Sequence, residues 1–329
     1  MVTTRRPCLA RLFFPLIALA LSMADAAGQP YPARAIRVIA PFAPGGGVDL
    51  LSRMLAAKLS LSESLGQPVI IDNRLGAGGA VGTELAARAA PDGYTLVFGN
   101  SSTHGVNQAY STLPYDSVKD FTPITLVTGA PLLFATASSF PANSIKDLIA
   151  QAKARPGELN YGSSGNGSVT HLTMELFKWV TGTNFVHIPY KGVGPVFTAI
   201  LTGEVQCLVV AVTTSMPHVQ AGRLKALGIT GERRSQVVPD VPTMAEQNVT
   251  GFETNYWYGL LGPAGMPKPI VARLNREVVK IVRTAEFRQK MSEQGAEAVG
   301  NTPDEFAKII KSDLAKWTKL VRDAGIKAD

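Results

Sequence analysis

The chain has 329 residues and a formal net charge of +7 at pH 7, and its basic residues are dispersed along the sequence. A dispersed excess of this size argues against a nucleic-acid-binding surface. Two cysteines are too few for a disulfide framework. The length is sufficient for a large buried core and favours two domains over one.

The first residues have the pattern of a secretory signal peptide. Two arginines precede a short apolar run at 12–21, and the tripeptide at 24–26 is an A-x-A cleavage site. The apolar run is about half as long as a membrane-spanning helix requires, so an N-terminal membrane anchor is the weaker alternative. We expect cleavage near Ala26 and export to the periplasm of a bacterium, with residues 1–26 removed.

The stretch at 42–49 is a glycine-rich turn between a strand at 36–40 and a helix whose leucines recur at helical spacing from Leu51. Glycine allows positive φ and lets a ligand approach backbone N–H groups. The first N–H groups of a helix lack intrahelical partners and lie at the positive end of its dipole. The turn therefore predicts an anion-binding site. The alternative is a tight connection that merely packs closely.

Two more strands in the first third are each followed by a loop of small residues. The strand at 68–71 leads into the loop at 72–82, and the strand at 94–98 leads into the loop at 99–105. Strands that alternate with helices predict a parallel sheet. All three loops then lie at the carboxyl ends of strands, which is the edge where open α/β sheets bind ligands. Their convergence favours a binding site.

The rest of the chain repeats this alternation. Short strands are expected at 132–135, 159–161, 185–189, 205–210 and 224–229. Glycine-rich or hydroxyl-rich loops follow three of them, at 162–168, 190–194 and 211–215. Two domains that face each other with these edges would enclose a cleft. A helix is expected at 144–154, with Ser144 as its N-cap. Further helices are expected from 170 and in the C-terminal part, where residues 302–305 form a capping box.

The loops carry no recognisable catalytic motif. Residues 162–165 are not G-x-S-x-G, and the glycines at 76, 78 and 82 are spaced one residue too widely for a dinucleotide fingerprint. The four histidines show no metal-ligand spacing. The donors in the loops suit holding an anion rather than cutting a bond. We therefore predict that the protein is not an enzyme and uses no cofactor or metal.

Motifs along the whole sequence point to one family. They include Tyr31-Pro32, Pro41-Phe42-Ala43-Pro44-Gly45-Gly46, Asn73-Arg74, Gly76-Ala77-Gly78-Gly79, Pro91-Asp92-Gly93-Tyr94, Leu113-Pro114-Tyr115-Asp116, His187-Ile188-Pro189-Tyr190-Lys191-Gly192 and Gly262-Pro263-Ala264-Gly265. With these motifs the chain closely resembles the Bug receptors, the extracytoplasmic solute-binding proteins of tripartite tricarboxylate transporters.

The resemblance implies an α/β, type II periplasmic-binding-protein fold: two doubly wound α/β domains with a ligand cleft between them. Domain 1 would comprise 27–127 and 251–329, and domain 2 would comprise 128–250. The ligand would be a small carboxylate, either a di- or tricarboxylate, an acidic amino acid or an aromatic acid. A monomeric receptor would deliver it to an inner-membrane tripartite tricarboxylate permease of two unequal membrane subunits. The alternatives are a ligand-sensing partner of a membrane signalling protein and an exported α/β enzyme acting on a carboxylate.

Our hypothesis gives ligand-binding roles to loops of both domains. In domain 1 the candidates are Phe42, Pro44, Gly45, Gly46, Gly78, Gly79, Ser101, Ser102 and Thr103. In domain 2 the candidates are Ser163, Ser164, Asn166, Thr170, His171, Tyr190, Lys191, Gly192 and Thr213.

Several of these loops leave alternatives open. His171 is either a packing residue or a donor, and Lys191 either binds ligand or is only solvated. Arg74 either contacts the anion or pairs with a neighbouring aspartate. Asp49 would repel an anion, so we expect it to serve the helix dipole and the loop shape. Gln206 stands where the family often has Asp, and we expect it near a cleft-facing strand end.

Overall fold

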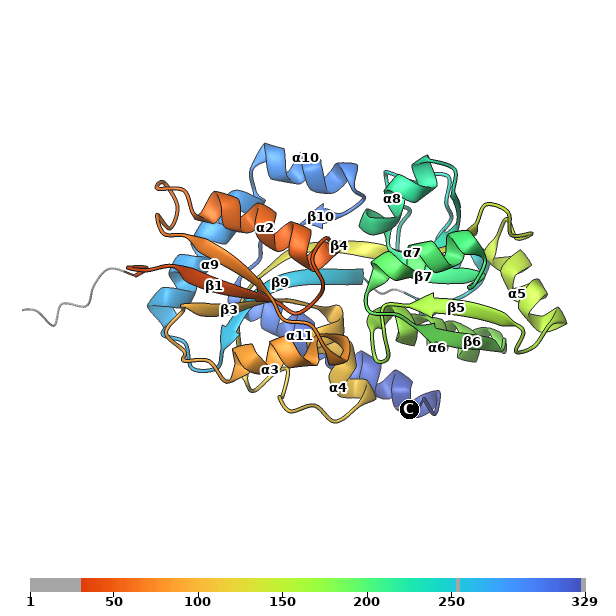
Figure 1. Ribbon diagram of the computed structural model, residues 1–329, viewed down its shortest axis with the longest axis horizontal. Helices are drawn as coiled ribbons and strands as arrows, with labels where there is room; N and C mark the ends of the chain where they lie inside the picture. The colour runs from red at the N-terminus through yellow and green to blue at the C-terminus, as the bar shows by residue number, and fades with distance from the viewer. Residues whose placement is uncertain (1–30, 253–254, 327–329) are drawn as a thin grey trace, which may run out of the picture. The chain divides into compact units, whose positions relative to one another are not determined.

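The computed structural model describes residues 31–252 and 255–326, so the predicted signal peptide at 1–26 lies outside the described residues. The chain divides into two units, 1–33 and 34–329. All the helices and strands named below belong to the second unit (Figure 1).

The strands and helices alternate through most of the chain. The strands are β1 (Ile36–Ala40), β2 (Val69–Asn73), β3 (Thr95–Asn100), β4 (Phe121–Ala137), β5 (Leu159–Ser163), β6 (Phe185–Pro189), β7 (Cys207–Ala211), β8 (Leu224–Ile229), β9 (Asn255–Pro263) and β10 (Glu297–Ala298). The α-helices are α2 (Gly47–Leu59), α3 (Ala80–Ala87), α4 (Asn107–Tyr110), α5 (Ile145–Ala154), α6 (Val169–Thr181), α7 (Val193–Thr202), α8 (Val212–Gln220), α9 (Lys268–Val282), α10 (Ala285–Glu293) and α11 (Pro303–Asp323). Short helical turns are η3 (Ala77–Gly79), η4 (Ser102–Val106) and η5 (Ala245–Gln247).

The strands form a mixed sheet in the order β2-β1-β3-β9-β4-β7-β5-β6, and β8 and β10 each pair with β4. Two groups of strands within it are parallel: β1 pairs with β2 and β3, and β5 pairs with β6 and β7. In contrast, β9 is antiparallel to both of its neighbours. The carboxyl ends of β1, β2 and β3 therefore share one edge, which confirms the predicted convergence of the first three loops.

One strand is much longer than the sequence indicates. The expected strand covers only 132–135, whereas β4 runs for 17 residues. Pro123 suggests the end of a strand, because proline has no N–H to donate to a neighbouring strand. It stands beside a register shift in the pairing of β4 with β9, where an irregular pattern of hydrogen bonds tolerates it. β4 pairs with β9 and with β7 and β8, so it joins the two parallel groups. The predicted boundary between residues 127 and 128 falls inside β4, and the division into domains stays a prediction.

Local capping signals fix several helix starts. The Ser144 side chain accepts the backbone N–H of Asp147 at the start of α5, as the sequence predicts. The capping box of Thr302 and Glu305 is present at the start of α11. Each cap satisfies N–H groups that have no partner within the helix, so these starts depend on neighbouring residues alone.

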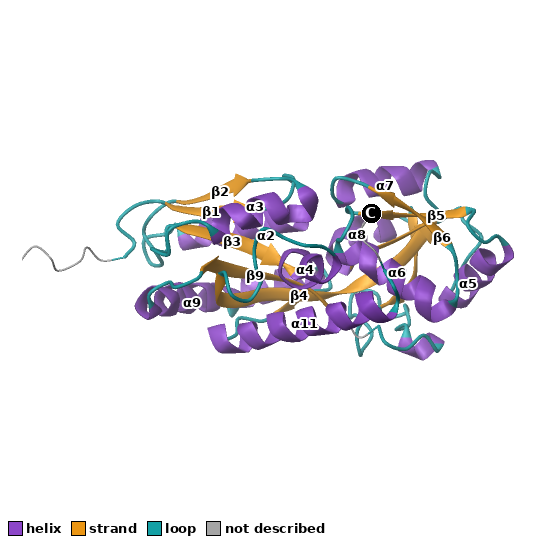
Figure 2. Cartoon of the chain, turned by 90° about the horizontal axis from the view of Figure 1, so that it is seen from below, coloured by secondary structure: helices purple, strands orange, loops and turns teal. Residues whose placement is uncertain are grey.

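The sheet is covered on both faces, because successive side chains of a strand point to opposite sides. Leu132 and Phe134 of β4 belong to the core beneath α5 and α6, whereas Leu133 belongs to the core beneath α7 and α8. In a third cluster, Phe306 and Ile310 of α11 pack near β1, β3 and β9. Figure 2 shows α11 running along β4. None of the helices in the described part of the chain combines the length and apolar character that a membrane crossing needs.

Candidate functional site

A cavity of about 750 Å³ opens where the carboxyl ends of β1, β3, β5, β6 and β7 meet. Its walls come from the β1–α2 turn, the starts of α6, α7 and α8, two tyrosines of β9, and the end of α10 with the residues that follow it. Apolar side chains such as Leu50, Met54, Phe197 and Met216 form much of the wall. The polar groups are therefore few and gather at particular points.

Three helices begin at this cavity without a side-chain cap. Their N-cap residues are Gly46 for α2, Gly192 for α7 and Ala211 for α8, and no side chain accepts a capping hydrogen bond there. The helices have 13, 10 and 9 residues, and each presents the positive end of its dipole at its start. Orphan N–H groups and positive dipole ends attract anions. The cavity is thus electropositive from two sides, the side of β1 and the side of β6 and β7.

Asp49 shapes the first of these helix starts. Its carboxylate, only 3% exposed, accepts the backbone N–H of Gly45 at 3.0 Å and the side-chain donors of Arg53 and Asn73 at 2.9 and 3.0 Å. Gly45 has φ +81°, which glycine adopts without strain. The aspartate therefore holds the loop as expected.

The electrostatics agree with a structural role for the acids of this region. Burial disfavours the charged form of Asp49, but hydrogen bonds from Arg53, Gly45 and Asn73 outweigh it and lower the pKa of the carboxyl. Arg74 pairs with Asp72 at 3.0 Å rather than lining the cavity, which decides between its two predicted roles in favour of the ion pair.

The floor of the cavity carries polar residues that the sequence analysis missed. Asn100, Thr128, Tyr256 and Tyr258 come from β3, β4 and β9. Burial raises the pKa of both tyrosines, so their hydroxyls keep their protons at neutral pH and remain donors. The sequence did contain one indication of these residues: the two tyrosines are spaced i, i+2, which places both on the same face of a strand.

The cavity brings together half of the predicted ligand-binding residues. Those that line it are Phe42, Pro44, Gly45, Gly46, Ser164, Thr170, Lys191, Gly192 and Thr213. The others lie outside the lining: Gly78, Gly79, Ser101, Ser102, Thr103, Ser163, Asn166, His171 and Tyr190. All of these assignments stay predictions.

The hydroxyls of residues 101–103 serve the fold. β3 extends to Asn100 and a helical turn starts at once, where the sequence suggests an open loop. The Ser101 hydroxyl accepts the backbone N–H of Trp257, and that of Ser102 accepts the N–H of Val169. Thr103 exchanges hydrogen bonds with Asn100. All three predicted donors are buried.

Ser163 and His171 are also held inside the second group of strands. The Ser163 hydroxyl lies 2.6 Å from Nε2 of His187, and the ring of His187 stacks on that of His171 with centroids 4.0 Å apart. Nδ1 of His171 accepts the N–H of Gly167, and burial lowers the pKa of His171 to about 4. His171 is therefore neutral at physiological pH and packs against His187.

The other predicted residues outside the lining have structural partners. The carbonyl of Gly78 accepts a hydrogen bond from Asn107, and Gly79 packs against Phe42 closely enough that a Cβ would lie 3.0 Å from its ring. The Tyr190 hydroxyl donates to Glu204 at 2.8 Å. The backbone carbonyl of Asn166 lies beside Gly78.

One expectation is wrong. Gln206 precedes β7 and its amide oxygen accepts the N–H of Asn160 at 2.8 Å, so it lies at the amino end of the strand. The cavity is at the opposite end, at Ala211. The rule that ligands bind at the carboxyl ends of strands already excludes this position, and the expectation did not follow it. His104 is fully buried against Phe121, and burial lowers its pKa to about 3.

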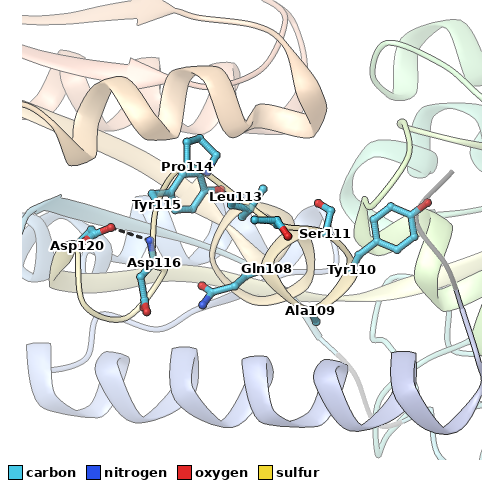
Figure 3. A pocket seen from close by; sticks show the side chains of 10 residues that line it. Gln108, Ala109, Tyr110, Ser111, Leu113, Pro114, Tyr115, Asp116 and Asp120 are labelled. Atoms are coloured by element: carbon cyan, nitrogen blue, oxygen red, sulfur yellow. Dashed lines mark hydrogen bonds between the residues drawn. The ribbon is translucent and has the colours of Figure 1, made fainter.

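A second hollow of about 760 Å³ has a simpler construction. Figure 3 shows that its side chains come from a single segment, 108–120. The carboxylate of Asp120 accepts the backbone N–H of Asp116 at 2.7 Å and so shapes the loop. Within residues 31–252 and 255–326, no group of three His, Cys, Asp or Glu side chains is arranged to hold a metal ion. The cavity at the strand ends, whose walls come from many separate elements, is therefore the candidate site.

Comparisons with known proteins agree with this geometry. A family model described as the tripartite tricarboxylate transporter family receptor matches residues 52–326. Protein BugT of Bordetella pertussis is 38% identical over 314 residues, which cover 94% of this chain and 95% of that protein.

Two solved structures are similar over nearly the whole chain. The R. palustris protein Rpa4515 with adipate has a TM-score of 0.86 and 36% identity, covering 90% of this chain and 99% of that one. MatC from Rhodopseudomonas palustris with bound malate has a TM-score of 0.84 and 33% identity, covering 88% and 100%.

The chain belongs to the tripartite tricarboxylate transporter receptor family, which includes the Bug proteins. It is a solute-binding receptor of the periplasmic type and not an enzyme. The predicted α/β fold of periplasmic binding proteins is confirmed.

Proposed function

We propose that this receptor captures a small carboxylate in the cavity and delivers it to an inner-membrane permease. The observation that carries the proposal is the meeting of three uncapped helix N-termini, those of α2, α7 and α8, at one cavity. Lys191 and Lys290 add positive charge to its wall, against one acid, Glu293. A carboxylate satisfies N–H groups that would otherwise be paired only with water.

Magnitudes support capture by backbone groups. A hydrogen bond to a charged group contributes about 1.5–3 kcal/mol net. Roughly four to six such bonds, less the cost of immobilisation, reach about 8 kcal/mol, which corresponds to micromolar affinity. The apolar wall around Leu50, Phe197 and Met216 suits a carbon skeleton between or beside the acidic groups. No arginine clamp is needed.

The relatives support the same chemistry. Rpa4515 is described with adipate and MatC with malate, both small dicarboxylates. Family membership supports the permease partner, a tripartite transporter. Removal of residues 1–26 would place the mature receptor in the periplasm, where such a permease meets it. Intact-mass measurement of the exported protein would test this, since cleavage near Ala26 predicts one defined loss of mass.

A thermal-shift screen tests the carboxylate proposal. The mature protein is first refolded to remove any ligand bound during expression. The panel holds adipate, malate, succinate, citrate, aspartate, glutamate, nicotinate and phthalate, with the matching amides and sugars as controls. Binding to the folded state raises the melting temperature by mass action.

The expected result is a shift with one or two acids and none with their amides. A shift with a neutral control and none with any acid would contradict the proposal, because the helix N-termini would then serve shape rather than charge. The panel thus separates recognition of the anion from recognition of the carbon skeleton.

A further inference from the structure

Apolar side chains line the cavity about one turn beyond the three uncapped helix starts. Leu50 is the fourth residue of α2, and Phe197 and Met216 are the fifth residues of α7 and α8. At a rise of 1.5 Å per residue, they lie about 4.5–6 Å along the helix axes from the first residues. A carboxylate held at one of these N-termini therefore has hydrocarbon side chains next to it, where the rest of the ligand must lie.

Leu50 is exposed although it stands in the wall of a cavity. It is 58% exposed, and the neighbouring Asp49 is held by hydrogen bonds from Arg53 and Asn73, which fix the turn of α2 that carries it. A large apolar side chain left exposed in a concave site marks a surface that a ligand covers. Burying it against hydrocarbon is favourable, whereas a polar group placed on it gains no hydrogen bond.

Phe197 is held in the wall by a stacked ring. The His218 ring of α8 stacks on the Phe197 ring of α7 with centroids 4.2 Å apart and planes at 22°. Phe197 lines the cavity and is only 9% exposed, whereas His218 lies outside the lining. Nδ1 of His218 is buried and has no hydrogen-bond partner among the described residues, so this side of the imidazole contributes packing alone. The stacking joins α7 to α8 and fixes the surface that Phe197 presents to a ligand.

Several polar side chains of the same wall are already engaged within the protein. The Thr128 hydroxyl donates to a backbone carbonyl at 2.7 Å, and the Thr214 hydroxyl donates to another at 3.0 Å. The hydroxyls of Ser164 and Thr170 lie 3.1 Å apart and share a hydrogen bond. A hydroxyl or amino group on the carbon skeleton of a ligand would lose water there and compete with these bonds for a partner.

We propose that the receptor selects acids with an unsubstituted hydrocarbon body over acids that carry a hydroxyl or amino group beside the carboxylate, and that Leu50 and Phe197 determine this specificity. His218 is a positioning residue that holds Phe197. Family membership does not make this choice, because similar proteins are described with adipate and with malate, one acid of each kind. A chain and a ring bury hydrocarbon on the same wall, so the body is either of the two. This inference rests on the proposed carboxylate function.

The first test compares acids that differ in one feature. Malate is succinate with an added hydroxyl, and adipate is succinate with additional methylene groups. In calorimetric titrations of the refolded mature protein, adipate should bind about tenfold more tightly than succinate, since each buried methylene contributes about fourfold in affinity. Malate should bind about tenfold or more weakly than succinate, because its hydroxyl loses water without gaining a partner. Phthalate carries a ring in place of the chain, and the tighter binder of phthalate and adipate identifies the body.

Leu50→Ser tests the wall without disturbing the core, because Leu50 is exposed. It should weaken binding of the tighter hydrocarbon acid about three- to tenfold more than binding of malate. Leu85→Ser is the matched control, since Leu85 of α3 is 41% exposed and lies outside the lining. Its affinities for both acids should stay within about twofold of wild type.

Variants of His218 test the positioning role. His218→Ala removes the stacked ring, so it should weaken binding of the hydrocarbon acid about threefold or more relative to malate. His218→Phe keeps a ring against Phe197 and should restore the wild-type ratio of the two affinities. A general loss of structure would weaken binding of both acids alike. Phe197→Ala should lower the same ratio, and circular dichroism first establishes that this core variant folds.

The outcomes separate the possible failures. Malate binding as tight as that of both adipate and phthalate, or an unchanged affinity ratio in Leu50→Ser, would overturn the inference and leave the carboxylate function standing. An unchanged ratio in His218→Ala would overturn the positioning role of His218. A wild-type protein that binds no acid of the panel would overturn the proposed function and this inference with it.

Discussion

Gly295 stands between two residues that line the cavity, Gln294 and Ala296, and enlarging it should weaken ligand binding. It follows α10 and precedes β10, which pairs with β4 beside β9. A Cβ at this position would lie 2.5 Å from Cγ2 of Val237 and 2.6 Å from Cγ1 of Val212. Val212 is the first residue of α8 and Val237 follows β8, so an added methyl group would press the segment after α10 against these two segments.

The magnitude of Gly295→Ala has two parts. Gly295 has φ +74°, and alanine in that conformation costs about 1–2 kcal/mol. Ordinary carbon contacts are about 3.5–4.0 Å, so the methyl group also requires its neighbours to move by about 1 Å, an overpacking cost of about 1–3 kcal/mol. If the segment after α10 moves away from Val212 and Val237 to relieve the clash, the overpacking cost is avoided in the unliganded protein but opposes ligand binding. At about 1.4 kcal/mol per tenfold, a cost of about 1–3 kcal/mol corresponds to a 5- to 150-fold loss of ligand affinity.

Gly265→Ala is the matched control. Its φ is +82°, and no heavy atom of the described chain lies within 4 Å of a Cβ there, so it carries the backbone cost without the clash. Urea unfolding of the unliganded proteins should show similar losses for both variants. Calorimetric titration with the acid identified in the screen should show weakened binding only for Gly295→Ala. Equal affinities for the two variants would refute the reasoning, because ligand affinity would then not depend on the packing around Gly295.

Three further predictions concern single residues. Gly46→Val should keep the fold, because the nearest atom to an added Cβ is 3.5 Å away. Its side chain should fill part of the cavity and lower the affinity for the acid at least tenfold, measured by calorimetry. Wild-type affinity would contradict the placement of Gly46 in the binding site. Asp49→Asn should lower the free energy of unfolding by about 1–3 kcal/mol in urea titrations at pH 7. The pKa of Asp49 is lowered in the fold, so this stabilisation is present above the ordinary value of 3.8 and is lost as pH falls below it; equal stability of variant and wild type at pH 7 would count against the role. Burial raises the pKa of the Cys207 thiol, so a thiol reagent at pH 8 should label it only after denaturation, as mass spectrometry of the labelled peptide would show; rapid labelling of the native protein would disprove this.

Features that depend on neighbouring residues could be predicted from the sequence. The glycine turn before α2, the Ser144 cap and the capping box at Thr302 all arise from hydrogen bonds within a few residues of chain. Their chemistry is fixed by residue type and spacing, and the structure has them where the pattern indicates. The convergence of the loops followed from one further rule, that parallel strands share their carboxyl edge.

Features that depend on pairing between distant segments could not be predicted. β4 pairs with β9 across more than a hundred residues of chain, and no local pattern in 121–131 reveals that partner. The cavity floor, including Tyr256 and Tyr258, follows from that pairing and was missed with it. Ser102 lies outside the cavity lining, and its residue type could not show this, because a serine has the same hydroxyl whether it faces a ligand or accepts the N–H of Val169 inside the fold.

The most direct test of the account is a calorimetric titration of the refolded wild-type protein. The two titrants are the panel acid with the largest thermal shift and its amide, which has the same carbon skeleton without the charge. The account predicts micromolar binding of the acid and no measurable binding of the amide, because the three helix N-termini recognise the anion. Equal affinity for acid and amide would contradict it, since the cavity would then recognise the skeleton and not the carboxylate.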